Sequence, residues 1–133
     1  MSKTTLIDTD YVTLWYDSEK KIVHHKFHKY IYGQEFRNVL EKGLEVFKQE
    51  GAHKWLSDDR NNSALPTEDT TWAQTNWTPR VVAAGWKYWA IVLPEKVIGQ
   101  MNMQHFIETN SKMGVTVQIF SDPDKARLWL ERQ

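Results

Sequence analysis

The sequence has no cysteine, no surplus of charge of either sign and no long apolar run. The absence of cysteine excludes disulfides, thiolate nucleophiles, iron–sulfur clusters and cysteine zinc sites. Seventeen basic residues balance seventeen acidic ones, so no long-range field attracts phosphate backbones, and we expect no nucleic-acid partner. No segment approaches the roughly 20 apolar residues of a membrane span, and residues 1–10 lack the apolar core of a signal peptide. We therefore expect a cytoplasmic protein without a membrane span.

The 133 residues suffice for one domain, and neither an internal repeat nor a linker divides them. A hydrophobic fraction of 41% and a charged fraction of 26% are typical of a globular protein. Residues 1–133 are therefore interpreted as a single domain. Seven tryptophans exceed the number that the expected core positions require. Because aromatic side chains favour protein interfaces, we expect a homodimer.

The first half of the chain changes from strand-like alternation to helical spacing. Residues 11–16 and 22–27 alternate on either side of a polar turn, which predicts an antiparallel β-hairpin. From Tyr32 to Gln49 the apolar residues recur at helical spacing, and Gly51 is suited to end that helix. The apolar arc consists of Phe36, Val39, Leu40, Gly43, Leu44, Val46 and Phe47. Because the opposite arc is polar, we expect this helix to cover one face of a sheet.

Strands and helices are expected to alternate in the second half. The predicted strands are His53–Leu56, Lys87–Leu93 and Val115–Phe120. The predicted helices start from the N-cap residues Thr67, Asn102 and Asp122, and Pro79 is expected to kink the first of them. A hairpin followed by αβαβαβα predicts an α/β fold with a mixed, mainly parallel sheet, right-handed crossovers and about four helices.

This order of elements, together with two short motifs, resembles a known group of proteins. The motifs are GWKYWAIVLP at Gly85–Pro94 and DPDKARLWL at Asp122–Leu130. They are similar to the corresponding segments of single-domain bacterial STAS-like proteins, a superfamily named after sulfate transporters and anti-sigma-factor antagonists. The resemblance covers nearly the whole chain in element order. It implies a non-catalytic module that binds a protein partner or a small, lipid-like molecule.

The phosphorylation switch of the anti-sigma-factor antagonists does not carry over to this chain. In that family a phosphorylatable serine lies in an Asp-Ser-x-Gly turn after the strand that corresponds to His53–Leu56. Here residues 58–63 read Asp-Asp-Arg-Asn-Asn-Ser, with neither an Asp-Ser pair nor a glycine. Ser63 lies outside the matching motif and is not predicted to be a phosphosite.

Three histidines, His24, His25 and His28, lie close together in sequence but do not predict a metal site. On an extended strand, neighbouring side chains point to opposite faces, and residues four apart are separated by about 13 Å. A zinc ion needs ligand nitrogens about 2.1 Å away. We expect His24 and His28 to face solvent and His25 to be partly buried. No metal and no cofactor are predicted.

The candidate binding residues follow the carboxyl ends of the predicted parallel strands, where open α/β sheets bind ligands. The candidate ligand- or partner-binding residues are Asp58, Asp59, Arg60, Gln100, Met101 and Trp72. Convergence of their segments would give a pocket of mixed polar and apolar lining. The same residues equally fit an Asp/Arg network that orders a loop, or a dimer contact.

No catalytic residue is predicted. The chain lacks the G-x-G-x-x-G, G-x-x-x-x-G-K-[ST], G-x-S-x-G and H-E-x-x-H motifs, so we do not expect an enzyme. The first expectation is therefore a protein-interaction or regulatory module. The alternative is a carrier of a small molecule with its site at the carboxyl ends of the parallel strands.

Overall fold

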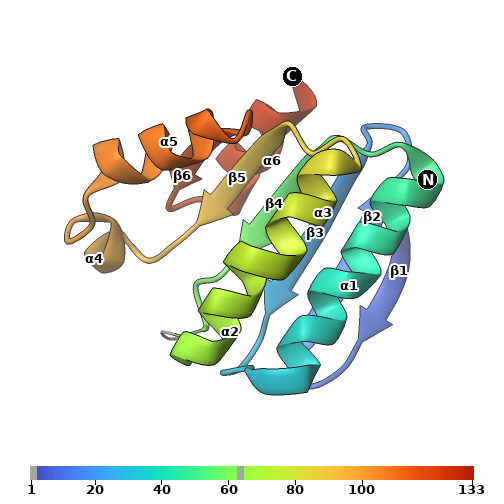
Figure 1. Cartoon of the computed structure of the whole chain (residues 1–133), viewed down its shortest axis with the longest axis horizontal. Coiled ribbons are helices and arrows are strands. Elements are labelled where there is room, and N and C mark those ends of the chain that lie inside the picture. Colours follow the sequence, from blue (N-terminus) through green and yellow to red (C-terminus); the bar gives the residue numbers. More distant parts are fainter. Residues whose placement is uncertain (1–2, 63–64) are drawn as a thin grey trace.

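A computed structural model describes residues 3–62 and 65–133, which form an α/β fold built on one six-stranded sheet (Figure 1). The strands are β1 (Lys3–Asp8), β2 (Val12–Asp17), β3 (Ile22–Phe27), β4 (Lys54–Asp58), β5 (Tyr88–Val92) and β6 (Thr116–Phe120). The helices are α1 (Gly33–Glu50), α2 (Thr67–Trp72), the π-helix η1 (Ala73–Trp77), α3 (Thr78–Ala83), α4 (Glu95–Ile98), α5 (Met103–Lys112) and α6 (Pro123–Glu131). Ser63 lies outside the described residues. Within the described ranges, no helix combines the length and the apolar character that crossing a membrane requires.

The six strands lie side by side in the order of the sequence. β1, β2 and β3 pair antiparallel, whereas β3, β4, β5 and β6 pair parallel. The predicted hairpin and the mixed sheet are thus confirmed. Because parallel strands run in the same direction, the carboxyl ends of β3 to β6 meet at one edge of the sheet. We call this the carboxyl edge.

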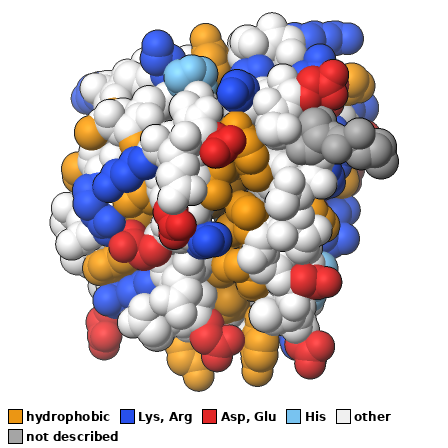
Figure 2. All heavy atoms as spheres, turned by 90° about the vertical axis from the view of Figure 1, so that its right-hand side faces the viewer, with side chains coloured by type: hydrophobic (Ala, Val, Ile, Leu, Met, Phe, Trp, Pro, Cys, Tyr) orange, Lys and Arg blue, Asp and Glu red, His pale blue; other side chains and the backbone are white. Residues whose placement is uncertain are grey.

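The edge strand β1 is an element that the sequence pattern did not indicate. Its register against β2 shifts between Thr5 and Ile7, and this irregularity breaks the apolar alternation by which a strand is recognised. Leu6 and Ile7 are partly buried against the core. On the side of the molecule formed by α1 and β1, apolar side chains remain visible as a stripe between polar ones (Figure 2).

α1 covers the sheet as its periodicity predicts. The seven residues of the predicted apolar arc are all buried, and the chain leaves the helix through Gly51 in the left-handed conformation, with φ 68°. Gly43 lies against the ring of Trp55 from β4. Helices α1, α2 and α3 lie over one face of the sheet (Figure 1), and Phe106 of α5 contacts Trp89 on the same face. We call this the α1 face.

The connection between β4 and β5 is one helical segment that is interrupted by a π-helical turn. Pro79 stands in the first turn of α3, directly after the π-helix η1, where the expected irregularity occurs. The expected N-cap is wrong: Pro66 is the cap residue, Thr67 is the first residue of the helix, and no side chain caps it. Pro66 fits because its φ of −56° suits a proline.

α6 packs alone on the opposite face, which we call the α6 face. Ala126 and Leu130 are fully buried there against Leu56, Ala90 and Val92. The predicted caps of the last two long helices are confirmed. The Asn102 side chain accepts a hydrogen bond from the His105 N–H at 3.1 Å, and that of Asp122 from the Asp124 N–H at 2.9 Å.

A candidate functional site at the carboxyl edge

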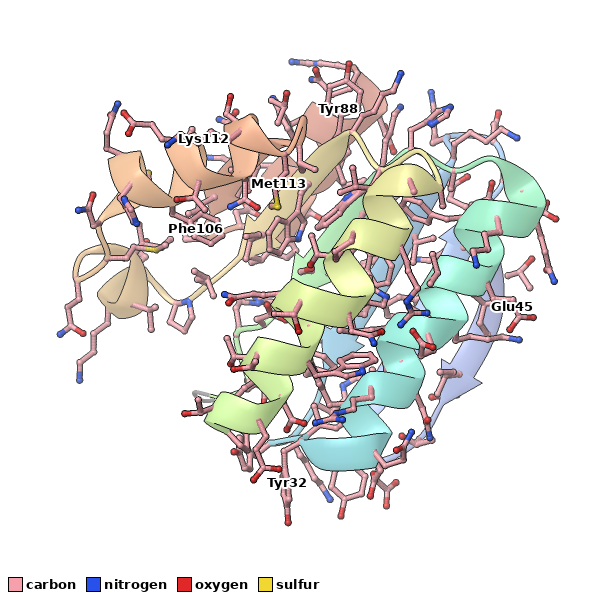
Figure 3. The ribbon with its side chains drawn as sticks, in the orientation of Figure 1. Tyr32, Glu45, Tyr88, Phe106, Lys112 and Met113 are labelled. Atoms are coloured by element: carbon pink, nitrogen blue, oxygen red, sulfur yellow. The ribbon has the colours of Figure 1, made fainter. Side chains whose placement is uncertain are left out.

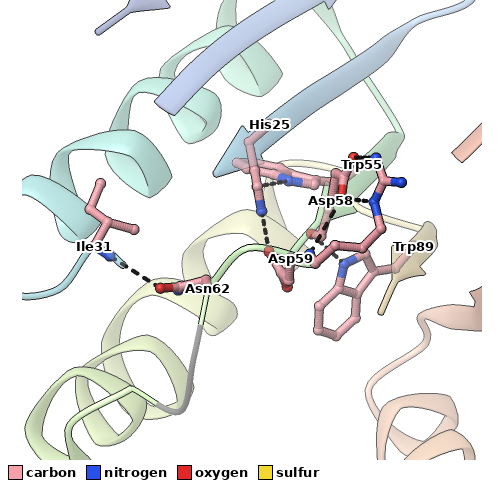
Figure 4. A network of polar contacts seen from close by, with 9 residues as sticks. His25, Ile31, Trp55, Asp58, Asp59, Asn62 and Trp89 are labelled. Atoms are coloured by element: carbon pink, nitrogen blue, oxygen red, sulfur yellow. Dashed lines mark hydrogen bonds and ion pairs between the residues drawn. The ribbon is translucent and has the colours of Figure 1, made fainter. Parts of the chain in front are cut away.

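A histidine, a carboxylate and a tryptophan form a hydrogen-bonded chain where β3 and β4 end (Figure 4). His25 of β3 and Trp55 of β4 both point to the α1 face. The His25 Nε2 lies 2.7 Å from the Asp59 Oδ1, and the Trp55 Nε1–H donates to the His25 Nδ1 at 3.0 Å. His25 is 4% exposed and Trp55 is 1% exposed, so this chain is anchored in the core.

The partners of His25 assign its tautomer. An indole N–H is only a donor, so the His25 Nδ1 accepts, and the single proton of the neutral ring lies on Nε2. That proton is donated to the Asp59 carboxylate. Both ring nitrogens are occupied, and no lone pair of His25 remains to accept a proton from a substrate. In this arrangement the pair holds the loop after β4 against the end of β3.

The neighbouring carboxylate, that of Asp58, binds a different side chain on the opposite face of the sheet. Asp58 is 2% exposed and accepts two hydrogen bonds from the Arg60 guanidinium, from Nε at 2.9 Å and from Nη2 at 2.8 Å. Burial alone would raise the pKa of Asp58, but the hydrogen bonds and the charge of Arg60 outweigh it, so the pKa is lowered. The side chains of Asp58 and Asp59 lie on opposite faces because successive side chains of a strand point to opposite sides of the sheet.

The loop after β4 is fixed by further hydrogen bonds. The Asp59 N–H donates to the Val92 carbonyl at 3.0 Å. The Asn62 Oδ1 accepts from the Ile31 N–H at 3.1 Å (Figure 4). On the neighbouring strand, the Trp89 Nε1–H donates to the Ser57 Oγ at 2.9 Å. Residues 59–62 are therefore joined both to β5 and to the segment that leads into α1.

The remaining candidate residues have other neighbours. The backbone N–H groups of Gln100 and Met101 bond back into α4, to the carbonyls of Val97 and Ile98. The Trp72 ring lies 5.1 Å from the Arg37 guanidinium. Within residues 3–62 and 65–133, no hydrogen bond or cation–π contact joins these three residues to the loop after β4. The structure therefore brings together Asp58 with Arg60, and Asp59 with His25.

His24 contradicts the expectation that it faces solvent, because it is 9% exposed. Its ring lies 4.6 Å from that of Trp15 on the α6 face, whereas His28 is exposed as expected. Among the described residues, no group of three histidine or acidic side chains is placed to hold a metal ion.

A group of exposed tyrosines next to the loop was not singled out from the sequence. Tyr11, Tyr30 and Tyr32 are 42%, 39% and 57% exposed and surround an open depression of about 290 Å³ at the start of α1. The rings of Tyr30 and Tyr32 are stacked with centroids 5.2 Å apart. Tyr32 projects from this end of the molecule (Figure 3). We call these three side chains the tyrosine surface; the run Tyr30-Ile31-Tyr32 between a strand and a helix is the signal that could have revealed it.

Comparisons with known proteins add no relative. No protein-family model matches the chain, no curated protein matches it, and no solved structure matches it. A function must therefore be argued from the geometry of the carboxyl edge and of the tyrosine surface.

Proposed function

We propose that this chain is a cytoplasmic, STAS-like protein-interaction module without catalytic activity, and that it forms a homodimer through the tyrosine surface. The observation that carries the proposal is the exposure of Tyr11, Tyr30 and Tyr32 beside a firmly held loop. Tyrosine is enriched at the centres of protein interfaces, where its ring offers a large contact area and few rotatable bonds.

The backbone that carries these rings is preorganised. The Ile31 N–H is bonded to Asn62, and the Gly33 N–H to Asp69 at 2.7 Å, so both sides of Tyr32 are anchored. An interface that is already ordered loses less conformational entropy when it binds. More of the contact energy of the exposed rings therefore contributes to the binding affinity.

Charges at the margins of the tyrosine surface support a second copy as the partner. The Lys29 ammonium lies 5.8 Å from the centre of the Tyr11 ring, and Glu35 lies in the first turn of α1. In a two-fold interface the same patch meets itself, so residue i of one copy contacts residue j of the other in both directions. A patch with a cation and a carboxylate at its margins suits such pairing, because Lys29 of each copy would pair with Glu35 of the other.

The occupied hydrogen-bonding groups of the carboxyl edge favour binding over catalysis. Both nitrogens of His25 are engaged, and the Asp58 carboxylate is held by Arg60. The small-molecule carrier remains the alternative function, with the open depression beside Tyr32 as the space that a ligand would enter. Native mass spectrometry of freshly purified protein separates the two functions, because a retained mass that is lost in Tyr32→Ser favours a carrier.

Light scattering on a sizing column tests the homodimer. The wild-type protein should have the mass of a dimer at high micromolar concentration, and Tyr32→Ser and Tyr11→Ser should shift it to a monomer. Leu128→Ser is the matched control, because Leu128 is an exposed apolar residue, 50% exposed, on α6. A monomeric wild-type protein, or a dimer that only Leu128→Ser disrupts, would contradict the proposal.

A further inference from the structure

A small cavity lies on the α6 face, at the border between the part of the sheet that α6 covers and the part that it leaves open. α6 packs mainly on β4, β5 and β6. The cavity measures about 100 Å³, and its lining includes Lys3, Trp15, Asp17, His24, Arg127 and Glu131. Four of these six residues come from the antiparallel part of the sheet and two from α6. The cavity is separate from the tyrosine surface, so its role is independent of the proposed function.

A buried polar atom in this lining has no hydrogen-bond partner among the described residues. His24 is 9% exposed, and its Nε2 is buried without a hydrogen bond. Burial, followed by the charges of Lys3 and Arg127, lowers the pKa of His24 to about 3, while the charge of Asp58 opposes the shift. The ring is therefore neutral at physiological pH. Buried polar groups in proteins are nearly always paired, and an orphan of this kind indicates a missing partner.

Two cationic side chains converge on the same space. Lys3 and Arg127 both line the cavity. Burial and then the charge of Arg127 lower the pKa of Lys3, and the charge of Asp17 opposes that shift. The Lys3 ammonium lies 4.3 Å from the centre of the Trp15 ring. Over the described part of the chain, the ion pairs do not include Lys3 or Arg127. Two neighbouring cations without a carboxylate partner favour an anion between them.

The lining also contains two carboxylates, those of Asp17 and Glu131. The Asp17 Oδ1 accepts hydrogen bonds from the backbone N–H groups of Glu19 and Lys20, at 3.0 and 3.1 Å, and so forms the turn after β2. Burial and then the charge of Lys20 lower the pKa of Lys54, and the charge of Glu131 opposes that shift. Among the ion pairs of the described residues, none joins Glu131 to Lys3 or Arg127.

We infer that this cavity binds a small oxyanion, a phosphate or carboxylate group, between Lys3 and Arg127, with the His24 imidazole as a neutral donor. The guanidinium can hold two oxygens of such a group at once, and the ammonium can hold a third. A space of about 100 Å³ admits one such group and not a nucleotide. Because the neighbouring sheet face is open, the group can be a free ion or the end of a larger molecule whose remainder stays in solvent.

Calorimetric titration with inorganic phosphate, at constant ionic strength set with chloride, tests the inference. The wild-type protein should bind phosphate with a Kd of about 1 mM or below, and Arg127→Gln should weaken binding about tenfold. Arg132→Gln is the matched control: it removes the same charge from the exposed end of α6 and should leave the Kd unchanged within about twofold. Lys3→Gln provides a second test if Arg127→Gln unfolds.

Two further measurements complete the experiment. The His24 imidazole nitrogens, followed by NMR, should shift when phosphate binds, whereas those of the exposed His105 should not. If glycerol 3-phosphate binds more tightly than phosphate, the bound oxyanion is part of a larger ligand. If the two bind equally, the ligand is a free ion. Absence of phosphate binding beyond the chloride control, or equal losses in Arg127→Gln and Arg132→Gln, would overturn the inference.

Discussion

Asp69, in the first turn of α2, caps a different helix from its own. Its Oδ2 accepts a hydrogen bond from the Gly33 N–H at the start of α1, at 2.7 Å, and its Oδ1 accepts one from the Arg37 Nε at 3.1 Å. The N-cap residue of α1 is Tyr32, whose side chain makes no capping bond. A carboxylate from another element thus satisfies an N–H group that the local sequence leaves unpaired.

Asp69→Ala should therefore destabilise the protein strongly. The side chain is 3% exposed, and its loss removes the cap of α1 and the partner of Arg37. We expect the free energy of unfolding to fall by about 2–3 kcal/mol, measured by urea denaturation. The control is Glu68→Ala, an exposed acidic residue in the same turn, which should change stability by no more than about 0.5 kcal/mol. Similar effects of both substitutions would refute the tertiary cap.

Gly43→Ala should destabilise α1 although alanine is the better helix former. A Cβ at this position would overlap the six-membered ring of Trp55, which is buried and cannot move aside. Overpacking of this kind costs about 1–3 kcal/mol and exceeds the gain of about 1 kcal/mol in helix propensity. Thermal denaturation of Gly43→Ala and of the exposed control Gln49→Ala would show this. A stabilised Gly43→Ala variant would mean that Trp55 packs differently.

His24 should make the protein less stable in weak acid. Its pKa is about 3 in the folded state and 6.5 when unperturbed, so between these values the unfolded chain binds the additional proton. Stability is therefore greatest above pH 6.5 and declines as the pH falls toward 3. At pH 5 the loss is about 2 kcal/mol, from 1.5 pH units at about 1.36 kcal/mol each.

Urea denaturation at pH 7 and pH 5 measures this loss. His24→Phe, which cannot be protonated, should remove most of the difference, whereas His105→Gln, at an exposed position on α5, should retain it. If His24→Phe kept the full pH dependence, another group would be responsible.

The two partners of the Asp58–Arg60 pair should differ in the cost of their removal. The Asp58 side chain is 3% exposed and that of Arg60 is 35% exposed. Arg60→Ala leaves a buried carboxylate unpaired and should cost about 2 kcal/mol, whereas Asp58→Asn leaves an arginine that can turn to solvent and should cost about 1 kcal/mol. Arg60→Ala should also raise the pKa of Asp58, which carbon-detected NMR can follow. Equal costs would indicate that the pair contributes little.

The elements that the sequence predicted are those whose signals are local. α1 was recognisable to within one residue at either end because Phe36, Val39 and Leu40 recur at helical spacing and Gly51 supplies the left-handed exit. Asn102 and Asp122 were recognisable as caps because a capping side chain bonds to a backbone N–H two or three residues away. β1 was missed because its stability comes from pairing with β2 and not from its own pattern.

The candidate site was only partly predictable. The sequence correctly placed Asp58, Asp59 and Arg60 at the end of a parallel strand, but it could not assign partners to them. His25 lies 34 residues before Asp59, and only the parallel pairing of β3 with β4 brings the two side chains together.

The sequence by itself determined the α/β class, the mixed sheet, the order of strands β2 to β6 with the helices α1, α5 and α6, and the absence of thiol chemistry, since periodicity, capping residues and composition are local properties. Only the tertiary structure decided that the side chains of Asp58 and Asp59 lie on opposite faces of the sheet, that Asp69 caps α1, and that Lys3 and Arg127 line one cavity. These contacts join residues that are distant in sequence, or they depend on which face of the sheet a side chain points to. They arise from strand register and helix packing, which no local sequence pattern encodes.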